Sequence, residues 1–187
     1  VPRTAPSAAQ SVVGVSGNAQ VALSWSAPSS NGGNAVTDYV VQYSSDGTTW
    51  TTFTDSVSST ASVTVTGLTN GTAYTFRVAA VNAGGTGMYS VVSAAVIPFT
   101  TPDAPTAVAG VTGNAQVAVS WTLPASNGGS AIIQYKVSYA PEGTDSYGTW
   151  SNATATQSSS TTFTVTGLTN GTSYKFKVAA TNAAGES

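Results

Sequence analysis

Residues 17–25 read Gly-Asn-Ala-Gln-Val-Ala-Leu-Ser-Trp, and residues 113–121 read Gly-Asn-Ala-Gln-Val-Ala-Val-Ser-Trp. The two stretches lie 96 residues apart and differ at one position. Later in the chain, Thr-Val-Thr-Gly-Leu-Thr-Asn-Gly-Thr occurs at 64–72 and again, unchanged, 100 residues further on at 164–172. A repeat of this length predicts two copies of one folding unit, because each copy has the size of a small domain.

The two copies differ in length and meet at a proline-rich stretch. The match between them shifts by four residues after Tyr139, so we expect an insertion in the loop at 143–148. Residues 98–105 contain three prolines, which lack an amide donor and interrupt β-sheets. The sequence therefore predicts two modules, at 1–99 and 100–187.

Within each copy, apolar residues alternate with polar ones, the pattern of half-buried β-strands. Val21, Leu23 and Trp25 fall on one side of such a strand, and the residues between them fall on the other. Pairs such as Asn70-Gly71 separate the runs, as turns do. We expect a core built from Trp25, Tyr39, Tyr43, Leu68 and Tyr74 in the first copy and from Trp121, Tyr135, Tyr139, Leu168 and Tyr174 in the second. The pattern predicts an all-β protein of two antiparallel sandwiches.

Four marks occur in the same order in both copies. They are a proline near the start (Pro6, Pro105), the tryptophan (Trp25, Trp121), Tyr-x-Val-x-Tyr (39–43, 135–139) and Leu-x-x-Gly-Thr-x-Tyr (68–74, 168–174). In this combination the chain resembles fibronectin type III modules over nearly its whole length. The resemblance implies an immunoglobulin-like sandwich with a tyrosine corner, in which the hydroxyl of the last tyrosine bonds to nearby backbone. The Ser-Asn-Gly-Gly stretches at 30–33 and 126–129 resemble bacterial or bacteriophage members of the family.

The two copies differ at their C-terminal ends. The resemblance implies a seventh strand over Tyr89–Ile97 in the first copy, whereas the second copy stops at Ser187, before the matching residues. We therefore expect the second sandwich to lack its last strand and to leave one edge of Tyr174–Asn182 open. An open edge is a template for another strand. Either the chain is part of a longer protein, or a partner supplies the strand.

The composition excludes several classes of function. Charged residues make up 6% of the chain, with five Lys and Arg against seven Asp and Glu, too few cations to neutralise nucleic-acid phosphates. No apolar run approaches the roughly 20 residues of a membrane-spanning helix. Histidine and cysteine are absent, and no pair of carboxylates recurs in both copies. We therefore expect no catalytic residues, no cofactor, no metal site and no membrane insertion.

Three further motifs have structural explanations beside functional ones. A sugar-stacking platform is one interpretation of Trp50, Trp150, Tyr147, Phe53 and Tyr89, but the two tryptophans recur in register, as packing residues do. Asp46 and Glu142, each followed by glycine, contain calcium-ligand types, but hairpin turns explain them with fewer assumptions. The N-glycosylation pattern Asn-x-Thr occurs at Asn70, Asn152 and Asn170, but turn geometry already explains the Asn-Gly pairs at Asn70 and Asn170.

These observations predict a non-catalytic structural or adhesive repeat segment, a spacer or scaffold within a larger extracellular surface, secreted or virion protein. The Arg-Gly-Asp adhesion tripeptide is absent. The alternative is a carbohydrate-binding accessory pair in a secreted polysaccharide-degrading enzyme. Expected partners are proteins or neighbouring copies, through strand addition at the Tyr174–Asn182 edge, and a polysaccharide would fit the alternative.

Overall fold

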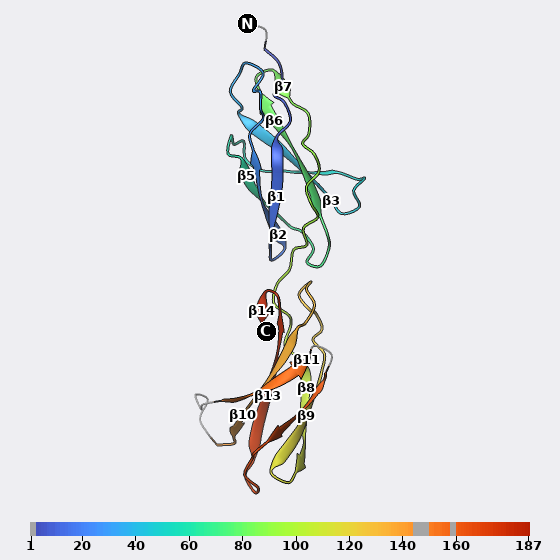
Figure 1. Ribbon diagram of the computed structural model, residues 1–187, viewed down its shortest axis with the longest axis vertical. Coiled ribbons are helices and arrows are strands. Elements are labelled where there is room, and N and C mark those ends of the chain that lie inside the picture. Colours follow the sequence, from blue (N-terminus) through green and yellow to red (C-terminus); the bar gives the residue numbers. More distant parts are fainter. Residues whose placement is uncertain (1–2, 144–149, 158–159) are drawn as a thin grey trace. The chain divides into compact units, whose positions relative to one another are not determined.

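The computed structural model describes residues 3–143, 150–157 and 160–187 (Figure 1). It separates into two compact units, Val1–Phe99 and Thr100–Ser187, called unit 1 and unit 2 below. Each unit holds two antiparallel sheets, and the described residues form no helix. The predicted all-β fold of two sandwiches is therefore confirmed.

In unit 1 the first sheet has three strands and the second has four. The first has the order β1 (Gln10–Gly17), β2 (Gln20–Ser26), β5 (Ser62–Thr66). The second has the order β4 (Thr51–Phe53), β3 (Asp38–Ser44), β6 (Thr75–Asn82), β7 (Gly85–Thr86).

Unit 2 repeats this order. Its first sheet contains β8 (Thr106–Gly113), β9 (Gln116–Thr122) and β12 (Thr162–Thr166). Its second contains β11 (Ser151–Gln157), β10 (Gln134–Pro141), β13 (Tyr174–Asn182) and β14 (Gly185–Glu186). The inserted residues predicted at 143–148 lie almost entirely outside the described residues.

The alternating side chains meet between the two sheets of each unit. Trp25 is packed edge-on against Tyr39, with ring centroids 5.1 Å apart, and Trp121 is packed against Tyr135 at 5.3 Å. Leu68, Tyr74 and Leu168 are also buried. The remaining expected core residues, Tyr43, Tyr139 and Tyr174, are half-buried and pack against the two cores from their margins.

Tyr74 and Tyr174 each tie a turn to the strand that follows it. The hydroxyl of Tyr74 accepts a hydrogen bond from the amide of Thr69 at 3.2 Å, and that of Tyr174 accepts one from Thr169 at 3.1 Å. Because the turn at 68–73 thereby has a fixed partner, it presents Asn70 in a defined position.

Asn70 braces the hairpin between β1 and β2. Its Oδ1 accepts a hydrogen bond from the amide of Ala19 at 2.8 Å, and its Nδ2 donates to Asn18 Oδ1 at 2.8 Å. Ala19 has a φ of 53°, the left-handed region that alanine occupies at a cost. Asn170 braces Asn114 and Ala115 in the same way, with φ 52° at Ala115. The hairpin turn at Ala19, and the matching turn at Ala115 in unit 2, is thus a strained turn that an asparagine side chain holds in place.

The prediction of a regular seventh strand over Tyr89–Ile97 is wrong. After β7 only Val96 forms a β-bridge, to Tyr74. The segment nevertheless runs along β6 and is hydrogen-bonded to it. Successive bonds lie three residues apart on the segment but two residues apart on β6. In order, the amides of Gly87, Ser90, Ser93 and Val96 donate to the carbonyls of Ala80, Val78, Phe76 and Tyr74. A ladder needs equal steps on both strands, so this three-for-two register cannot form a continuous one. We call residues 87–96 the edge segment.

Each unit also secures the residue at its own boundary. In unit 1 the amide of Phe99 donates to the carbonyl of Gly17 at 3.2 Å. In unit 2 the amide of Thr100 donates to the carbonyl of Gly128 at 2.8 Å. Phe99 is therefore hydrogen-bonded to unit 1 and the next residue, Thr100, to unit 2, so the boundary falls at the peptide bond between them.

Candidate functional site: an aromatic face and a sheet edge

On the outer face of β3 and β6, the guanidinium of Arg77 is stacked between two aromatic rings. It lies 4.1 Å from the centroid of Trp50 and 4.4 Å from that of Tyr89. Its Nε and Nη2 both donate to Oε1 of Gln42, at 2.9 and 2.7 Å. Each ring therefore has a face covered by the arginine, and Phe53 is half-buried against the core. In unit 1, two of the aromatics considered for a sugar platform, Trp50 and Tyr89, are therefore stacked on Arg77.

Unit 2 has a more open version of this face. The ammonium of Lys177 lies 4.4 Å from the centroid of Trp150, and the ring has no second aromatic partner among the described residues. Tyr147, the fifth residue of the considered platform, lies outside the described residues. A cleft of about 330 Å³ opens beside Trp150, lined by Lys136, Ser138, Asn152, Lys177, Val178, Ala179, Glu186 and Ser187.

Polar contacts organise the walls of this cleft. Lys136 forms an ion pair with Glu186 at 3.1 Å, both side chains being partly exposed. The buried Ser138 donates to Asn152 Oδ1 at 2.9 Å, so the asparagine of one predicted glycosylation pattern faces its own sheet. The cleft thus combines an aromatic ring, a cation and amide and hydroxyl groups at the edge of β13.

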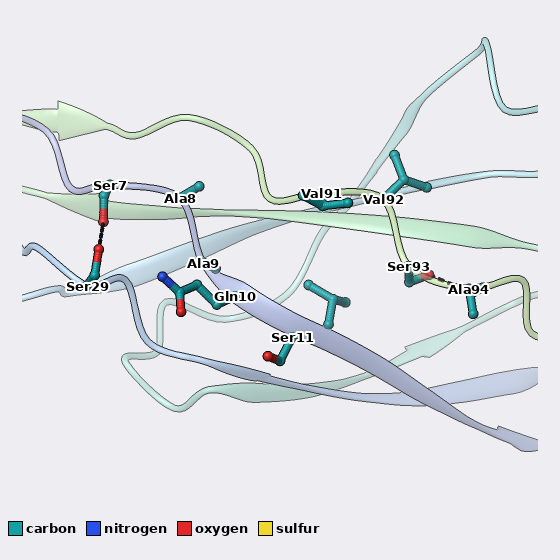
Figure 2. Close-up of a pocket in the computed structure, with 11 residues that line it drawn as sticks. Ser7, Ala8, Ala9, Gln10, Ser11, Ser29, Val91, Val92, Ser93 and Ala94 are labelled. Atoms are coloured by element: carbon teal, nitrogen blue, oxygen red, sulfur yellow. Dashed lines mark hydrogen bonds between the residues drawn. The ribbon is translucent and has the colours of Figure 1, made fainter.

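A second groove, of about 480 Å³, lies in unit 1 between the start of β1 and the edge segment (Figure 2). Figure 2 shows the hydroxyls of Ser7 and Ser29 facing each other, 3.2 Å apart, at one end, and Val91 to Ala94 along the opposite side. Serine, alanine, valine and one glutamine line it, with no charged side chain. It therefore offers no ion-pairing group to a charged ligand.

Asp46, one of the two acidic residues considered for calcium binding, serves a turn instead. Oδ1 of Asp46 accepts hydrogen bonds from the amides of Thr49 and Thr48, at 2.7 and 2.8 Å, and from the hydroxyl of Ser44 at 2.9 Å. These bonds, the one from Thr49 first, hold the pKa of Asp46 well below its usual range. Because this oxygen is occupied by turn donors, the geometry is that of a hairpin loop. Among the described residues, no three His, Cys, Asp or Glu side chains gather as a metal site requires.

Among the described residues, Asp38 and Asp55 form the acidic neighbourhood in which a pKa is raised. Burial, and then the negative charge of Asp38, raise the pKa of Asp55. Asp38 accepts a hydrogen bond from the amide of Ser58 at 3.0 Å. Unit 2 has Gln134 at the position of Asp38, so this pair belongs to unit 1 only.

Sequence analysis missed two buried asparagines that close one end of each unit. Asn82 donates from Nδ2 to the carbonyls of Thr4 and Asn31, at 2.9 and 2.6 Å, and accepts from the amide of Gly84 at 2.7 Å. Asn182 does the same with Thr100, Asn127 and Ala184. We call each asparagine with its three partners an entry clamp. The sequence does contain an indication of this role, because an Asn-Ala pair begins at the last residue of β6 and at the last residue of β13, in register in both copies.

The entry clamp also explains the Ser-Asn-Gly-Gly motif. A Cβ on Gly32, which has φ 66°, would lie 2.1 Å from the carbonyl oxygen of Thr4, and one on Gly128 would lie 2.2 Å from that of Thr100. Only glycine allows this approach. Oδ1 of Asn31 accepts from the amide of Gly33 at 3.0 Å and shapes the turn. The motif is therefore a structural seat for the residue that enters each unit.

In the described part of the chain, no helix is long and apolar enough to cross a membrane.

Comparison with known proteins gives one family and several multi-domain relatives. The family model of the fibronectin type III domain matches residues 4–96 and 101–187. Chitinase A1 of Niallia circulans is 36% identical over 197 residues, covering 99% of this chain and 25% of that protein. Human Myomesin-2 is 35% identical over 123 residues, covering 64% of this chain and 8% of that protein, and human Protein sidekick-1 is 32% identical over 170 residues, covering 88% and 8%. The chain spans a quarter or less of the length of each of these relatives.

Proposed function

Because the chain belongs to the fibronectin type III family, we propose that it serves as a non-catalytic spacer or scaffold segment within a larger extracellular protein. Modules of this family are non-catalytic repeats found in larger proteins, among them an enzyme, Chitinase A1. The observation that carries the proposal is that each unit is held together by contacts among its own residues. Each unit has its own buried core, and each binds its own boundary residue through the entry clamp.

The engagement of the surface aromatics supports the same role. In unit 1, Trp50 and Tyr89 contact the Arg77 guanidinium, and in unit 2 Trp150 contacts Lys177. Aromatic rings that pack against their own sheet stabilise a module and leave less ring surface for a ligand. An extracellular location is part of this proposal and fits a family common in cell-surface proteins.

Independent unfolding of the two units tests the spacer role. Trp121, buried in unit 2, is the residue to truncate, and Trp121→Ala should lower the stability of that unit by roughly 3–5 kcal/mol. The unfolding midpoint of unit 1 in the same chain should stay unchanged, which hydrogen exchange resolved by residue can measure. Loss of stability in both units would contradict the proposal, because a spacer module must keep its fold when its neighbour opens.

A second role, that of a carbohydrate-binding accessory pair, is favoured by one observation. The similarity to Chitinase A1 covers 99% of this chain. The cleft beside Trp150 is the place where unit 2 could contact a sugar ring, since it joins an aromatic face to hydroxyl and amide groups.

Sedimentation of the full chain with insoluble chitin and cellulose distinguishes the two roles. For a spacer, the bound fraction should equal that of an unrelated control protein. Retention that disappears in Trp150→Ala but persists in Trp50→Ala would establish the carbohydrate-binding role instead, because a cleft opens beside Trp150 whereas the Trp50 ring is stacked on Arg77.

A further inference from the structure

Four Asn-Gly pairs lie in turns of the chain. They begin at Asn31, Asn70, Asn127 and Asn170. In such a pair the backbone nitrogen of the glycine can attack the side-chain carbonyl carbon of the asparagine, because glycine has no side chain that obstructs the approach. The sequence alone therefore makes all four asparagines candidates for the same spontaneous reaction, in which the side chain loses ammonia.

The structure holds Asn70 and Asn170 on both polar atoms of the side chain. Oδ1 and Nδ2 of each are hydrogen-bonded to the hairpin turn that the residue braces, at 2.8 to 2.9 Å. In unit 1 the attacking nitrogen is engaged as well, since the amide of Gly71 donates to the carbonyl of Pro98 at 2.9 Å. Either carboxamide must first release two hydrogen bonds before it can turn and react, which lowers the fraction of chains in a reactive conformation.

Asn31 and Asn127 are held on the side-chain oxygen alone. Oδ1 of Asn31 accepts a hydrogen bond from the amide of Gly33 at 3.0 Å. Asn127 repeats this bond with Gly129 at 2.9 Å. Both residues are exposed, and in the described part of the chain neither Nδ2 has a hydrogen-bond partner. The nitrogen that would leave as ammonia is therefore free, whereas the oxygen that would gain negative charge already faces an N–H donor, as in an oxyanion hole.

The attacking nitrogens of these two pairs each face a serine hydroxyl. The amide of Gly32 donates to Ser30 Oγ at 3.3 Å, and the amide of Gly128 donates to Ser126 Oγ at 3.0 Å. The glycine nitrogen must lose this proton in order to attack. The hydroxyl is placed to accept it and relay it to water.

We propose that Asn31 and Asn127 are sites of spontaneous modification that accumulates with the age of the protein. Asn70 and Asn170 are protected by the turns that they brace. At Asn31 a bond forms between the Gly32 nitrogen and Cγ, the bond from Cγ to Nδ2 breaks, and ammonia leaves with the amide proton, giving a cyclic imide. Water then adds to one of the two imide carbonyls, so the products are aspartate and isoaspartate, and no oxidant or reductant takes part. This reaction is independent of the spacer role.

Isoaspartate at position 31 would open the entry clamp of unit 1. The backbone of isoaspartate runs through Cβ and Cγ, which adds one methylene before Gly32. Thr4 is seated against this peptide, because its amide donates to the Gly32 carbonyl at 3.0 Å and its carbonyl oxygen lies 2.1 Å from where a Cβ on Gly32 would be. A seat this close cannot accommodate a displaced Gly32, so Thr4 is released. Thr100 is bound to Gly128 in the same way, at 2.8 Å, and is released by the same change at Asn127.

Incubation of the full chain at pH 8 and 37 °C tests the ranking of the four sites, with peptide mass spectrometry and an isoaspartate assay as readouts. Asn31 and Asn127 should be converted roughly tenfold or more faster than Asn70 and Asn170, because the latter must break two hydrogen bonds first. The same chain in concentrated urea is the control, and there all four sites should react at similar rates. Equal rates at the four sites of the folded chain would overturn the proposal. So would a folded chain in which Asn31 and Asn127 stay unconverted while the urea sample reacts.

Hydrogen exchange tests the release of the clamped residues. In the isoaspartate-containing fraction of the incubated chain, the amides of Thr4 and Thr100 should lose their protection. Asn31→Asp and Asn127→Asp introduce the charge without lengthening the backbone, so these variants should keep both amides protected. Unchanged protection in the isoaspartate fraction, or equal loss in the aspartate variants, would overturn the release mechanism.

Discussion

Asn82 donates a hydrogen bond from Nδ2 to the carbonyl oxygen of Thr4, 2.9 Å away and 78 residues earlier in the chain. The asparagine is 5% exposed, so the bond is formed away from water. A buried amide of this kind is stabilising only when its hydrogen-bonding groups are paired, and here both the nitrogen and the oxygen have partners. The entry clamp is therefore a buried polar centre as well as a boundary.

Replacement of Asn182 by alanine should reduce the stability of unit 2 by about 2–4 kcal/mol, because the carbonyls of Thr100 and Asn127 lose their donor inside the unit. Urea unfolding followed by tryptophan fluorescence measures the loss. Thr164→Ala, at an exposed strand position, is the matched control and should change stability by less than about 0.5 kcal/mol. Equal effects of the two variants would mean that the clamp contributes nothing.

Ala19→Gly should stabilise unit 1 by about 0.5–1 kcal/mol. Glycine relieves the cost of a positive φ at this position, and this gain exceeds the extra backbone entropy that it brings to the unfolded chain. Ala22→Gly, at an exposed position of β2, is the control and should destabilise the unit instead. Thermal unfolding of both variants checks the opposite signs, and a loss of stability in Ala19→Gly would show that the turn is unstrained.

The stacked guanidinium predicts a difference between the units. Arg77→Ala should cost unit 1 about 1–2 kcal/mol, since it removes two ring contacts and both bonds to Gln42. Lys177→Ala, which removes one ring contact from unit 2, should cost less than about 0.7 kcal/mol. Denaturant midpoints of the two variants give the comparison. A larger loss in Lys177→Ala would reverse the ranking and disprove the stacking argument.

Asp46 makes the stability of unit 1 depend on pH in the acidic range. Its pKa is lower in the folded chain than in the unfolded chain, so its stabilising effect is present above the unfolded pKa of about 4 and is lost as the pH falls toward the folded value. Asp46→Asn should therefore destabilise unit 1 at pH 7 and have a smaller effect at pH 2.5, measured by thermal unfolding at both values. Equal destabilisation at both values would show that the carboxylate charge is not responsible.

The fold follows from the sequence because its signals are local and repeated. Alternation in 21–25 assigns Val21, Leu23 and Trp25 to one side of a strand, and the structure buries all three. The turns carry glycine or asparagine where the backbone needs them, as at Gly32 with φ 66°. Because the same residues recur in register in both copies, these patterns are unlike chance occurrences.

The edge segment and the entry clamp could not be predicted in the same way. Tyr89–Ile97 has the composition of a strand, but Ser90 and Ser93 accept from β6 through their hydroxyls, and no residue pattern with a period of two expresses that register. Asn82 is polar and ends a strand, so its local sequence indicates a surface turn. Its burial depends on Thr4 and Asn31, which are distant in sequence, and only the folded chain brings them together.

The division of hydrogen bonds between Phe99 and Thr100 has a genetic consequence. A recombination breakpoint at this peptide bond would keep the boundary contacts of both units, because Phe99 keeps its bond to Gly17 and Thr100 keeps its bond to Gly128 on either side of the cut. Breakpoints a few residues away would separate a clamped residue from its seat. Duplication, loss or exchange of a module at this joint therefore leaves the hydrogen bonds of Phe99 and Thr100 intact, and the same joint is where a cloning boundary should be placed.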